Sequence, residues 1–452
     1  MTMEWLIDKM RRYPGREAMI FGDERVTYQG LIDCIELWKR LLAKENIRPG
    51  QVAALTGEYS PSLCGALLAL MNNRNIIVPM SVQGQQQKEQ LEIAHADVLV
   101  ALEGDGGYRA VHYERGSRPP MLQNLADAGH PGLILFTSGT TGVPKAIVHD
   151  LIKFAERYKT PRDTLRTLTF LRFDHIGGMN TLLHTLANGG TVVCPKQLLP
   201  DDICAMIERY EIELLPTTPS FLNLLLMTGA YQRYDMSSLK MITYGTEVMP
   251  EYTLLQLYAA LPGVQFRQTY GLSEIGILRA KSKSGDSLLF KVGGEGVETE
   301  IRDGILHIRS KFAMEGYLNA PNPFDEEGWF NTQDQVVQEG DYIRILGRRS
   351  EIINVGGQKV YPAEVEAVLL QMPEVKDVTV RGEPNVLLGQ IVTADVNVVE
   401  DIDAKELKRR VQAFCSEKLE RHQIPVKVSI EASNLYSDRF KKIRNGSGVY
   451  TK

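Results

Sequence analysis

Residues 133–145 read LILFTSGTTGVPK, an apolar run followed by a loop of hydroxyl residues and glycines and then by Pro144 and Lys145. The apolar run is typical of a buried strand, which delivers the loop to the end of a sheet. Glycine backbones can approach a phosphate closely, and the hydroxyls and Lys145 supply further donors and positive charge. We therefore predict a polyphosphate-binding loop rather than an ordinary surface turn, although its spacing is not that of a Walker loop. The predicted phosphate ligands are Thr137, Ser138, Gly139, Thr140, Thr141, Gly142 and Lys145.

Strands and helices alternate further along the chain. Apolar runs at residues 191–194, 212–215, 241–244 and 264–270 are separated by helical patterns at 201–210, 220–227 and 251–261. We expect Asp201 or Asp202 to cap the first of these helices. The alternation predicts βαβ units on a mostly parallel sheet with flanking helices, and therefore an α/β fold that binds ligands at the carboxyl ends of its strands.

The pattern changes near Gly347, where a charged turn, Gly-Arg-Arg-Ser, follows an apolar run. Beyond it we predict helices at residues 362–370 and 404–419 and strands at 375–381, 390–399 and 426–430. This composition indicates a small α+β domain. We therefore predict an N-terminal domain over residues 1–347 and a C-terminal domain over 348–452.

Composition excludes several classes of protein. The 452 residues carry a net charge of −5 and are 43% hydrophobic, so no overall positive field favours nucleic acid or an anionic membrane. The five cysteines are scattered and form no close pair that would indicate a disulfide framework or a zinc site. Since no apolar stretch has the length of a membrane span or a secretory signal, we expect a cytoplasmic protein. The oligomeric state stays open.

The glycine-rich loop resembles the signature of the superfamily that contains acyl-CoA synthetases, peptide-synthetase adenylation domains and luciferases. Further matches follow in that family's order from about residue 25 to residue 445, and the chain looks most like a stand-alone acyl- or aryl-CoA ligase. The resemblance implies ATP-dependent activation of a carboxylic acid as an acyl-AMP with Mg²⁺. It also implies that the small C-terminal domain is mobile and that the active site lies between the two domains.

The segment YGLSE, residues 270–274, is similar to the family's YGxTE motif. The resemblance implies that Glu274 is the catalytic carboxylate that holds Mg²⁺, for which oxygen ligands are suited. It places Ser273 in the phosphate region, and Tyr270 and Gly271 beside the nucleotide.

The segment NTQD, residues 331–334, resembles the family's TGD motif, with Gln333 where glycine is usual. By this resemblance Asp334 binds the ribose hydroxyls, because a carboxylate can accept two hydrogen bonds from a diol. Arg348 is expected to reach the ribose or a phosphate, and Ser350 stands at the family's hinge position. Gly356 and Gly357 match the channel that admits a pantetheine thiol.

Near the end of the chain, residues 438–444 read DRFKKIR and resemble the family's tail motif, which makes Lys442 the catalytic lysine. A cation is needed there because negative charge builds on the α-phosphate and on pyrophosphate during attack. Lys441 replaces the family's usual glycine.

Weaker matches concern the acyl pocket and the adenine site. The segment FDHIGG, residues 173–178, resembles the border of the acyl pocket, so His175 is predicted to contact the substrate. Ser220, Thr269 and Gly271 are predicted pocket walls. The predicted adenine neighbours are Tyr244, which could stack on the base, Gly245 and Thr246.

We therefore predict an AMP-forming acid–thiol ligase that uses ATP, Mg²⁺ and coenzyme A, with an aryl or medium-sized carboxylic acid favoured as substrate. A first alternative is transfer to the phosphopantetheine of a separate acyl carrier protein. A second alternative, of another class, is a catalytically decayed nucleotide-binding regulatory protein. The departures Gln333, Ser350 and Lys441 motivate it, whereas Glu274 and Lys442 argue against it.

Overall fold

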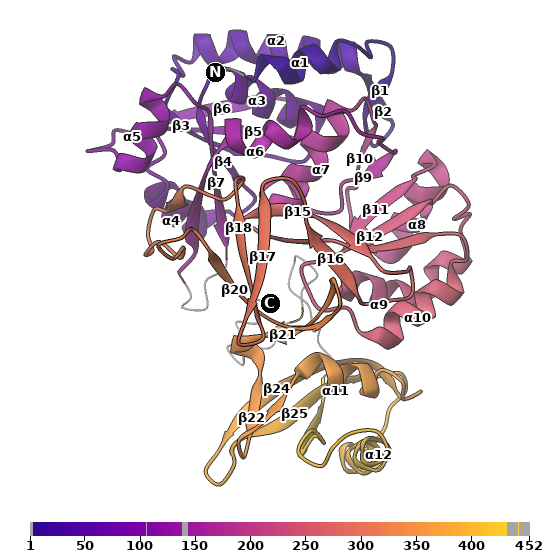
Figure 1. Cartoon of the computed structure of the whole chain (residues 1–452). Coiled ribbons are helices and arrows are strands. Elements are labelled where there is room, and N and C mark those ends of the chain that lie inside the picture. The colour runs from indigo at the N-terminus through magenta and orange to yellow at the C-terminus, as the bar shows by residue number, and fades with distance from the viewer. Residues whose placement is uncertain (1–2, 105, 138–142, 432–441, 443–452) are drawn as a thin grey trace.

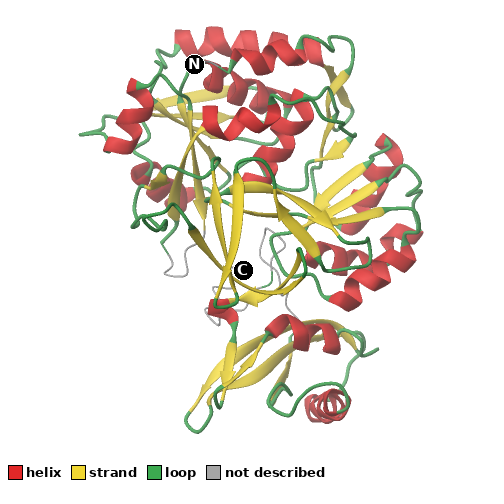
Figure 2. Cartoon of the chain, in the orientation of Figure 1, coloured by secondary structure: helices red, strands yellow, loops and turns green. Residues whose placement is uncertain are grey.

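A computed structural model describes residues 3–104, 106–137, 143–431 and 442. Figures 1 and 2 show a large part with three sheets and, below it, a smaller part with a sheet of its own. Each sheet of the large part has seven strands and the sheet of the small part has five. The predicted fold class, an α/β large domain followed by a small α+β domain, is confirmed. The boundary at residue 347 stays a prediction.

The sheet that carries the glycine-rich segment has the order β19-β8-β7-β4-β3-β5-β6. Its inner strands β3, β4, β5 and β7 are parallel, whereas β6, β8 and β19 are antiparallel to their neighbours. The strands are β3 (Val52–Thr56), β4 (Ile76–Met80), β5 (Val98–Leu102), β6 (Tyr108–His112), β7 (Gly132–Thr137), β8 (Lys145–Asp150) and β19 (Gly316–Tyr317). The accompanying helices are α2 (Tyr28–Lys44), α3 (Pro61–Asn72), α4 (Gly84–Ile93), α5 (Pro120–Asp127) and α6 (Leu151–Ala155), the last followed by η1 (Glu156–Tyr158).

The second sheet, in the order β13-β12-β11-β9-β10-β1-β2, contains the predicted βαβ units. All its neighbours are parallel except β1 and β2. Its strands are β1 (Glu17–Phe21), β2 (Glu24–Thr27), β9 (Thr167–Leu168), β10 (Val192–Cys194), β11 (Leu214–Thr217), β12 (Met241–Tyr244) and β13 (Gln265–Gln268). Its helices are α7 (Ile176–Ala187), α8 (Pro200–Tyr210), α9 (Pro219–Thr228), η2 (Ala230–Gln232) and α10 (Glu251–Ala260). The predicted cap of α8 is wrong, because Leu199 is the N-cap. Asp201 and Asp202 lie in the first turn, where their negative charges interact favourably with the helix dipole.

The third sheet is antiparallel throughout, in the order β14-β15-β16-β21-β20-β18-β17. It begins where the sequence pattern suggested one continuous strand, because the chain leaves the second sheet after β13 and enters the third at Tyr270. Its strands are β14 (Tyr270–Leu272), β15 (Gly276–Ser282), β16 (Phe290–Gly293), β17 (Val297–Arg302), β18 (Ile305–Ser310), β20 (Phe330–Glu339) and β21 (Tyr342–Arg348).

The small part follows η3 (Arg349–Glu351) and has its own hydrophobic cluster, centred on side chains such as Val365, Val378 and Val411. Its sheet runs β23-β22-β25-β24, with β26 beside β25. The elements are β22 (Ile353–Val355), β23 (Gln358–Val360), α11 (Pro362–Leu369), β24 (Val375–Asn385), β25 (Gly389–Val398), α12 (Ala404–Ser416) and β26 (Lys427–Ile430). The two predicted helices are therefore confirmed.

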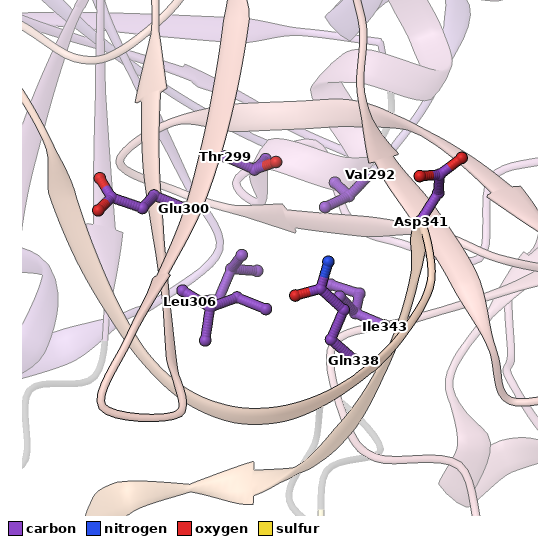
Figure 3. Close-up of a pocket in the computed structure, with 8 residues that line it drawn as sticks. Val292, Thr299, Glu300, Leu306, Gln338, Asp341 and Ile343 are labelled. Carbon is purple, nitrogen blue, oxygen red and sulfur yellow. The ribbon is translucent and has the colours of Figure 1, made fainter.

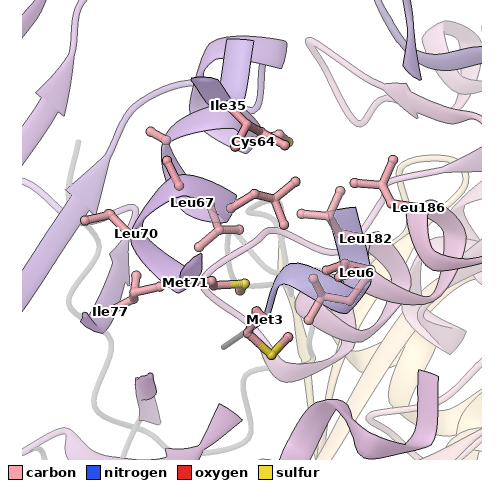
Figure 4. Close-up of a cluster of buried hydrophobic side chains, with 14 of the residues drawn as sticks. Met3, Leu6, Ile35, Cys64, Leu67, Leu70, Met71, Ile77, Leu182 and Leu186 are labelled. Carbon is pink, nitrogen blue, oxygen red and sulfur yellow. The ribbon is translucent and has the colours of Figure 1, made fainter. Parts of the chain in front are cut away.

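The main core of the large part lies between α2, α3, α7 and the short helix α1 (Glu4–Met10), as Figure 4 shows. Leu6 on α1, Leu67 on α3 and Leu182 on α7 are each at most 1% exposed. Burial of such side chains is worth roughly 2 kcal/mol each. This core fixes α7, whose N-cap is His175, against the rest of the domain. Among the described residues, no helix combines the length and the apolar character needed to cross a bilayer.

Gly178 in the first turn of α7 is required for this packing, because an added Cβ would lie 1.9 Å from the carbonyl oxygen of Arg172. We expect Gly178→Ala to lower the free energy of unfolding by about 3 kcal/mol, since the clash exceeds the roughly 1 kcal/mol that alanine adds in helix propensity. Urea denaturation measures this change. Gly15→Ala is the control: an added Cβ there meets nothing within 4 Å, and stability should stay within about 0.5 kcal/mol. Equal stability of the two variants would contradict the packing.

Candidate functional site

The end of the glycine-rich segment and the YGLSE motif meet at the side chain of Tyr317. Thr137 on β7 lies opposite Lys145 on β8, and the ammonium of Lys145 lies 5.1 Å from the centre of the Tyr317 ring. The hydroxyl of Tyr317 in turn donates to Oε1 of Glu274 at 2.7 Å. One short strand pair, β8 with β19, thus brings the predicted phosphate and magnesium ligands together. Ser138, Gly139, Thr140, Thr141 and Gly142 lie outside the described residues, and their roles stay predictions.

The loop that carries Glu274 is held through its backbone. The carbonyl of Ser273 accepts a hydrogen bond from Nε2 of His149 at 2.7 Å, and the carbonyl of Glu274 accepts one from the N–H of Met314 at 2.7 Å. The imidazole of His149 is 1% exposed, and burial lowers its pKa to about 4, so it is neutral at physiological pH. No motif in the sequence indicated His149, because its role depends on a residue far along the chain.

Asp334 forms the second half of the site. Its carboxylate is 6% exposed, accepts a hydrogen bond from the hydroxyl of Tyr270 at 2.6 Å, and lies 3.6 Å from Nε of Arg348 on the neighbouring strand. Burial raises the pKa of Asp334, and the charge of Arg348 opposes that shift. Tyr270 begins the strand that leads to Glu274, so the predicted ribose and magnesium ligands lie at one place in the fold. Gly271 follows Tyr270 in β14, where an added Cβ would lie 2.6 Å from the carbonyl of Gly276.

Gln333, which stands where the family usually has glycine, adopts a backbone conformation typical of glycine. Its φ is +61°, in the left-handed region where glycine is usual, and its N–H is held by the side chain of Asn331 at 2.9 Å. The backbone before Asp334 therefore adopts a conformation that suits glycine, with the strain expected of a non-glycine residue there.

The predicted adenine neighbours differ in their exposure and in their contacts. Tyr244 is 1% exposed and packs in the core of the second sheet, so its ring does not face a ligand in this arrangement and the expected stacking is not supported. Gly245 is needed for close approach, because an added Cβ would lie 2.5 Å from Oγ1 of Thr269. Thr269 itself donates to the carbonyl of Tyr244 at 2.8 Å. Thr246 is exposed with φ +72°, another strained position at a strand end.

The predicted pocket residues have structural partners. His175 is the N-cap of α7, where its Nδ1 accepts a hydrogen bond from the N–H of Gly177 at 3.1 Å. Ser220 in the first turn of α9 donates through its hydroxyl to Oε2 of Glu247 at 2.5 Å. The other oxygen of Glu247 accepts a hydrogen bond from the backbone N–H of Lys442 at 2.7 Å. Glu247 therefore joins the predicted pocket to the C-terminal segment.

The ammonium of Lys442 is enclosed by the small part and not presented to a ligand. It donates to the carbonyl of Val378 at 2.7 Å and lies 3.4 Å from Glu366 and 3.6 Å from Asp377. The Lys442 side chain is 7% exposed, and both carboxylates are almost fully buried. Asp377 also accepts a hydrogen bond from Asn223 on α9 at 3.3 Å. In this arrangement the ammonium of Lys442 therefore lies in the small part and not at the predicted phosphate site.

Gly356 and Gly357 are not brought to Glu274 either. They form the turn between β22 and β23 with φ of +59° and +89°, and β22 leads away from the large part in Figure 1. Gly356 donates through its N–H to the carbonyl of Leu388, at the tip of the neighbouring hairpin, at 2.8 Å. In this arrangement the turn expected to line the thiol channel belongs to the small part, and no contact joins it to Glu274 among the described residues.

A separate cavity of about 140 Å³ lies on the third sheet, lined by residues such as Thr299, Gln338 and Ile343 (Figure 3). Its two carboxylates already have cationic partners: Glu300 pairs with Arg302 at 3.1 Å, and Asp341 pairs with Lys291 at 2.7 Å. None of the predicted site residues lines it. The nucleotide site predicted around Glu274 is therefore distinct from this cavity.

The donor set at Glu274 fits a magnesium ion that is carried by a nucleotide. Within the described ranges, no group of three or more histidine, cysteine, aspartate or glutamate residues could form a cage for a metal ion. Mg²⁺ usually takes one or two carboxylates and completes its shell with water and phosphate oxygens. A single carboxylate next to a polyphosphate loop meets that requirement.

The fold and these residues define an AMP-forming ligase that uses ATP to activate a carboxylic acid. A family described as "AMP-binding enzyme" matches residues 6–318, and one described as "AMP-binding enzyme C-terminal domain" matches residues 364–439. The chain belongs to the AMP-binding enzyme family. The predictions of an enzyme and of this superfamily are therefore confirmed.

Similar proteins extend over nearly the whole chain. An indoleacetate–CoA ligase of Aromatoleum aromaticum is 27% identical, covering 94% of this chain and 93% of the relative. A 2-succinylbenzoate–CoA ligase of Bacillus licheniformis is 26% identical over 93% of this chain and 94% of its own. The solved structure of the anthranilate CoA ligase AuaEII with anthranoyl-AMP has a TM-score of 0.81 at 18% identity, covering 97% of this chain and 95% of that one. At that identity the structural likeness supports the fold.

The neutral buried imidazole of His149 makes stability depend on pH. In the unfolded chain the His149 imidazole binds a proton near pH 6.5, whereas in the folded protein it does so only near pH 4. The contribution of the neutral imidazole to the free energy of unfolding is therefore complete above pH 6.5 and is lost as the pH falls toward 4. Linkage gives a loss of about 2 kcal/mol between roughly pH 7.5 and pH 5. Urea denaturation should show that the free energy of unfolding of His149→Gln falls over this pH range by about 2 kcal/mol less than that of the unmodified protein. The exposed His112→Gln is the control, and identical profiles for all three proteins would contradict the burial of a neutral His149.

Proposed function

We propose that this enzyme activates an aryl or medium-sized carboxylic acid as an acyl-AMP and then transfers the acyl group to coenzyme A. The observation that carries the proposal is the unbroken set of contacts from Thr137 and Lys145 through Tyr317 to Glu274, with Asp334 bound to Tyr270 at the start of the same loop. The relatives named for aryl acids, indoleacetate and 2-succinylbenzoate, support the choice of acid. Their names as CoA ligases support the acceptor.

In the first half-reaction, a carboxylate oxygen of the acid attacks the α-phosphorus of ATP, the bond to the β-phosphate oxygen breaks, and pyrophosphate leaves. Lys145 and the adjoining loop orient the phosphates, and Asp334 with Arg348 orients the ribose. Positioning and electrostatics dominate such displacements, so no protein nucleophile is required. Mg²⁺, when bound at Glu274, neutralises developing charge on the phosphate oxygens.

In the second half-reaction, the thiol sulfur attacks the acyl carbon, the bond to the AMP oxygen breaks, and the thiol proton passes to solvent. We propose that residues 348–452 turn about Ser350, which lies exposed in the short turn η3. Such a movement would bring Gly356 and Gly357 toward the acyl-AMP. Because Glu366 and Asp377 belong to the same part as Lys442, the lysine would leave these two carboxylates by a separate movement when it acts at the phosphates in the first half-reaction. The separate hydrophobic cluster of the small part supports its movement as a unit.

A screen of pyrophosphate release over a panel of aryl, medium-chain and long-chain acids tests the substrate class. We expect release with at least one aryl or medium-sized acid, at a rate at least tenfold above that with long-chain acids. Coenzyme A and a phosphopantetheinylated acyl carrier protein are then supplied as separate acceptors, and thioester should form with coenzyme A. Thioester with the carrier protein alone would favour that alternative acceptor. No acid-dependent release across the panel would contradict the proposed activity.

Lys442→Ala tests the role of the lysine. We expect adenylate formation to fall about a hundredfold, because one cation at the developing charge is worth on the order of 3 kcal/mol. Thioester formation from supplied acyl-AMP should change less than threefold, as single-turnover assays of each step will measure. The exposed Lys418→Ala on the same domain is the control and should leave both steps unchanged. Equal losses in both steps would contradict the proposed release of Lys442 between them.

We also propose a cytoplasmic location. All five cysteines lie in the described part of the chain as free thiols, and four of them are buried. Unpaired thiols suit a reducing compartment.

A further inference from the structure

Strand β8 presents a row of side chains to the Glu274 loop. Successive residues of a strand point to opposite faces, so Lys145, Ile147 and His149 share one face. Tyr317 lies directly opposite Ile147 in the antiparallel pair and therefore shares that face too. Lys145, Tyr317 and His149 thus form one continuous edge beside the loop. Lys145 already belongs to the site, whereas Tyr317 and His149 have been given no task in either half-reaction.

His149 contacts the loop through one hydrogen bond to its backbone. Because the acceptor is the carbonyl oxygen of Ser273, Nε2 must carry the proton and Nδ1 must be the bare nitrogen. Within the described residues, Nδ1 has no hydrogen-bond partner and is buried. A phenylalanine or leucine would fill such a space without leaving a polar atom unpaired. The buried imidazole is therefore explained by what Nε2 does for Ser273.

Tyr317 contacts the carboxylate itself. Its hydroxyl donates to Oε1 of Glu274 at 2.7 Å, and no other described side chain hydrogen-bonds to that carboxylate. Burial and the adjacent charge of Glu274 raise the pKa of Tyr317, so the hydroxyl stays a donor at physiological pH. One carboxylate oxygen is thereby fixed, and the other is left to bind a cation.

We propose that Tyr317 and His149 are positioning residues that orient the carboxylate of Glu274 toward the metal ion of Mg·ATP. Tyr317 holds the carboxylate and His149 holds the peptide group immediately before it, so together they remove the freedom of Glu274 to turn away. This inference rests on the proposed function, in which Glu274 is the magnesium ligand. Groups that orient a metal ligand affect metal affinity more than the affinity for parts of the substrate remote from the metal.

The test measures binding of ATP by calorimetry, once with Mg²⁺ and once with EDTA, and so does not require the acid to be known. Tyr317→Phe and His149→Leu should each weaken binding of Mg·ATP about tenfold, the lower end of what lost orienting bonds cost. Binding of metal-free ATP should change less than twofold. His149→Gln, whose amide can donate in place of Nε2, should recover most of the loss.

Two further variants make the result specific. Tyr158→Phe is the matched control, because it removes a buried hydroxyl that donates to Asn180, away from the loop, and should leave both affinities unchanged. In a Glu274→Gln background, Tyr317→Phe should have no further effect on Mg·ATP if it acts through Glu274.

The outcomes separate the two proposals. Equal weakening of ATP binding with and without Mg²⁺, or an undiminished effect in the Glu274→Gln background, would overturn the positioning roles while leaving the proposed function intact. Failure of the unmodified protein to bind ATP in either condition would overturn the proposed function, and the positioning roles with it.

Discussion

The hydrogen bond between Tyr317 and Glu274 is the contact on which the site depends. It joins the third sheet, which carries Glu274, to β8 and β19 of the sheet that carries the phosphate loop. Glu274 and Lys145 lie in different sheets, and the side chain of Tyr317 contacts both of them. A short strand of two residues, β19, therefore aligns motifs that are far apart in sequence.

A second constraint lies in the small domain, where one cation faces two buried carboxylates. Glu366 and Asp377 are each 1% exposed, and the ammonium of Lys442 lies within 4 Å of both. Buried carboxylates without a counter-charge are strongly unfavourable, so the position of Lys442 is coupled to the stability of this domain. The lysine that we propose to act at the phosphates thus has a defined resting place. Asn223 adds a contact from the large domain to the same cluster.

Two of the described non-glycine residues with positive φ lie at predicted nucleotide motifs. Thr246 and Gln333 both adopt positive φ although neither is glycine, and each lies beside a residue predicted to contact the nucleotide. Such conformations cost of order 1–3 kcal/mol and persist where surrounding contacts impose them. At Gln333 the side chain of Asn331 is one such contact. At Gln333 the backbone thus has a conformation typical of glycine although the residue is not glycine.

The sequence by itself determined the α/β class and the βαβ alternation, because strand periodicity is a local property. Its short motifs, which are also local, predicted the roles of Glu274 and Asp334. Only the tertiary structure decided what those residues touch. His149 carries no local signal, since its partner lies on another sheet. Tyr244 is buried because packing of helices on the second sheet, and not its motif, sets its exposure. Lys442 lies against two carboxylates that the sequence places some seventy residues earlier, and only folding makes them neighbours.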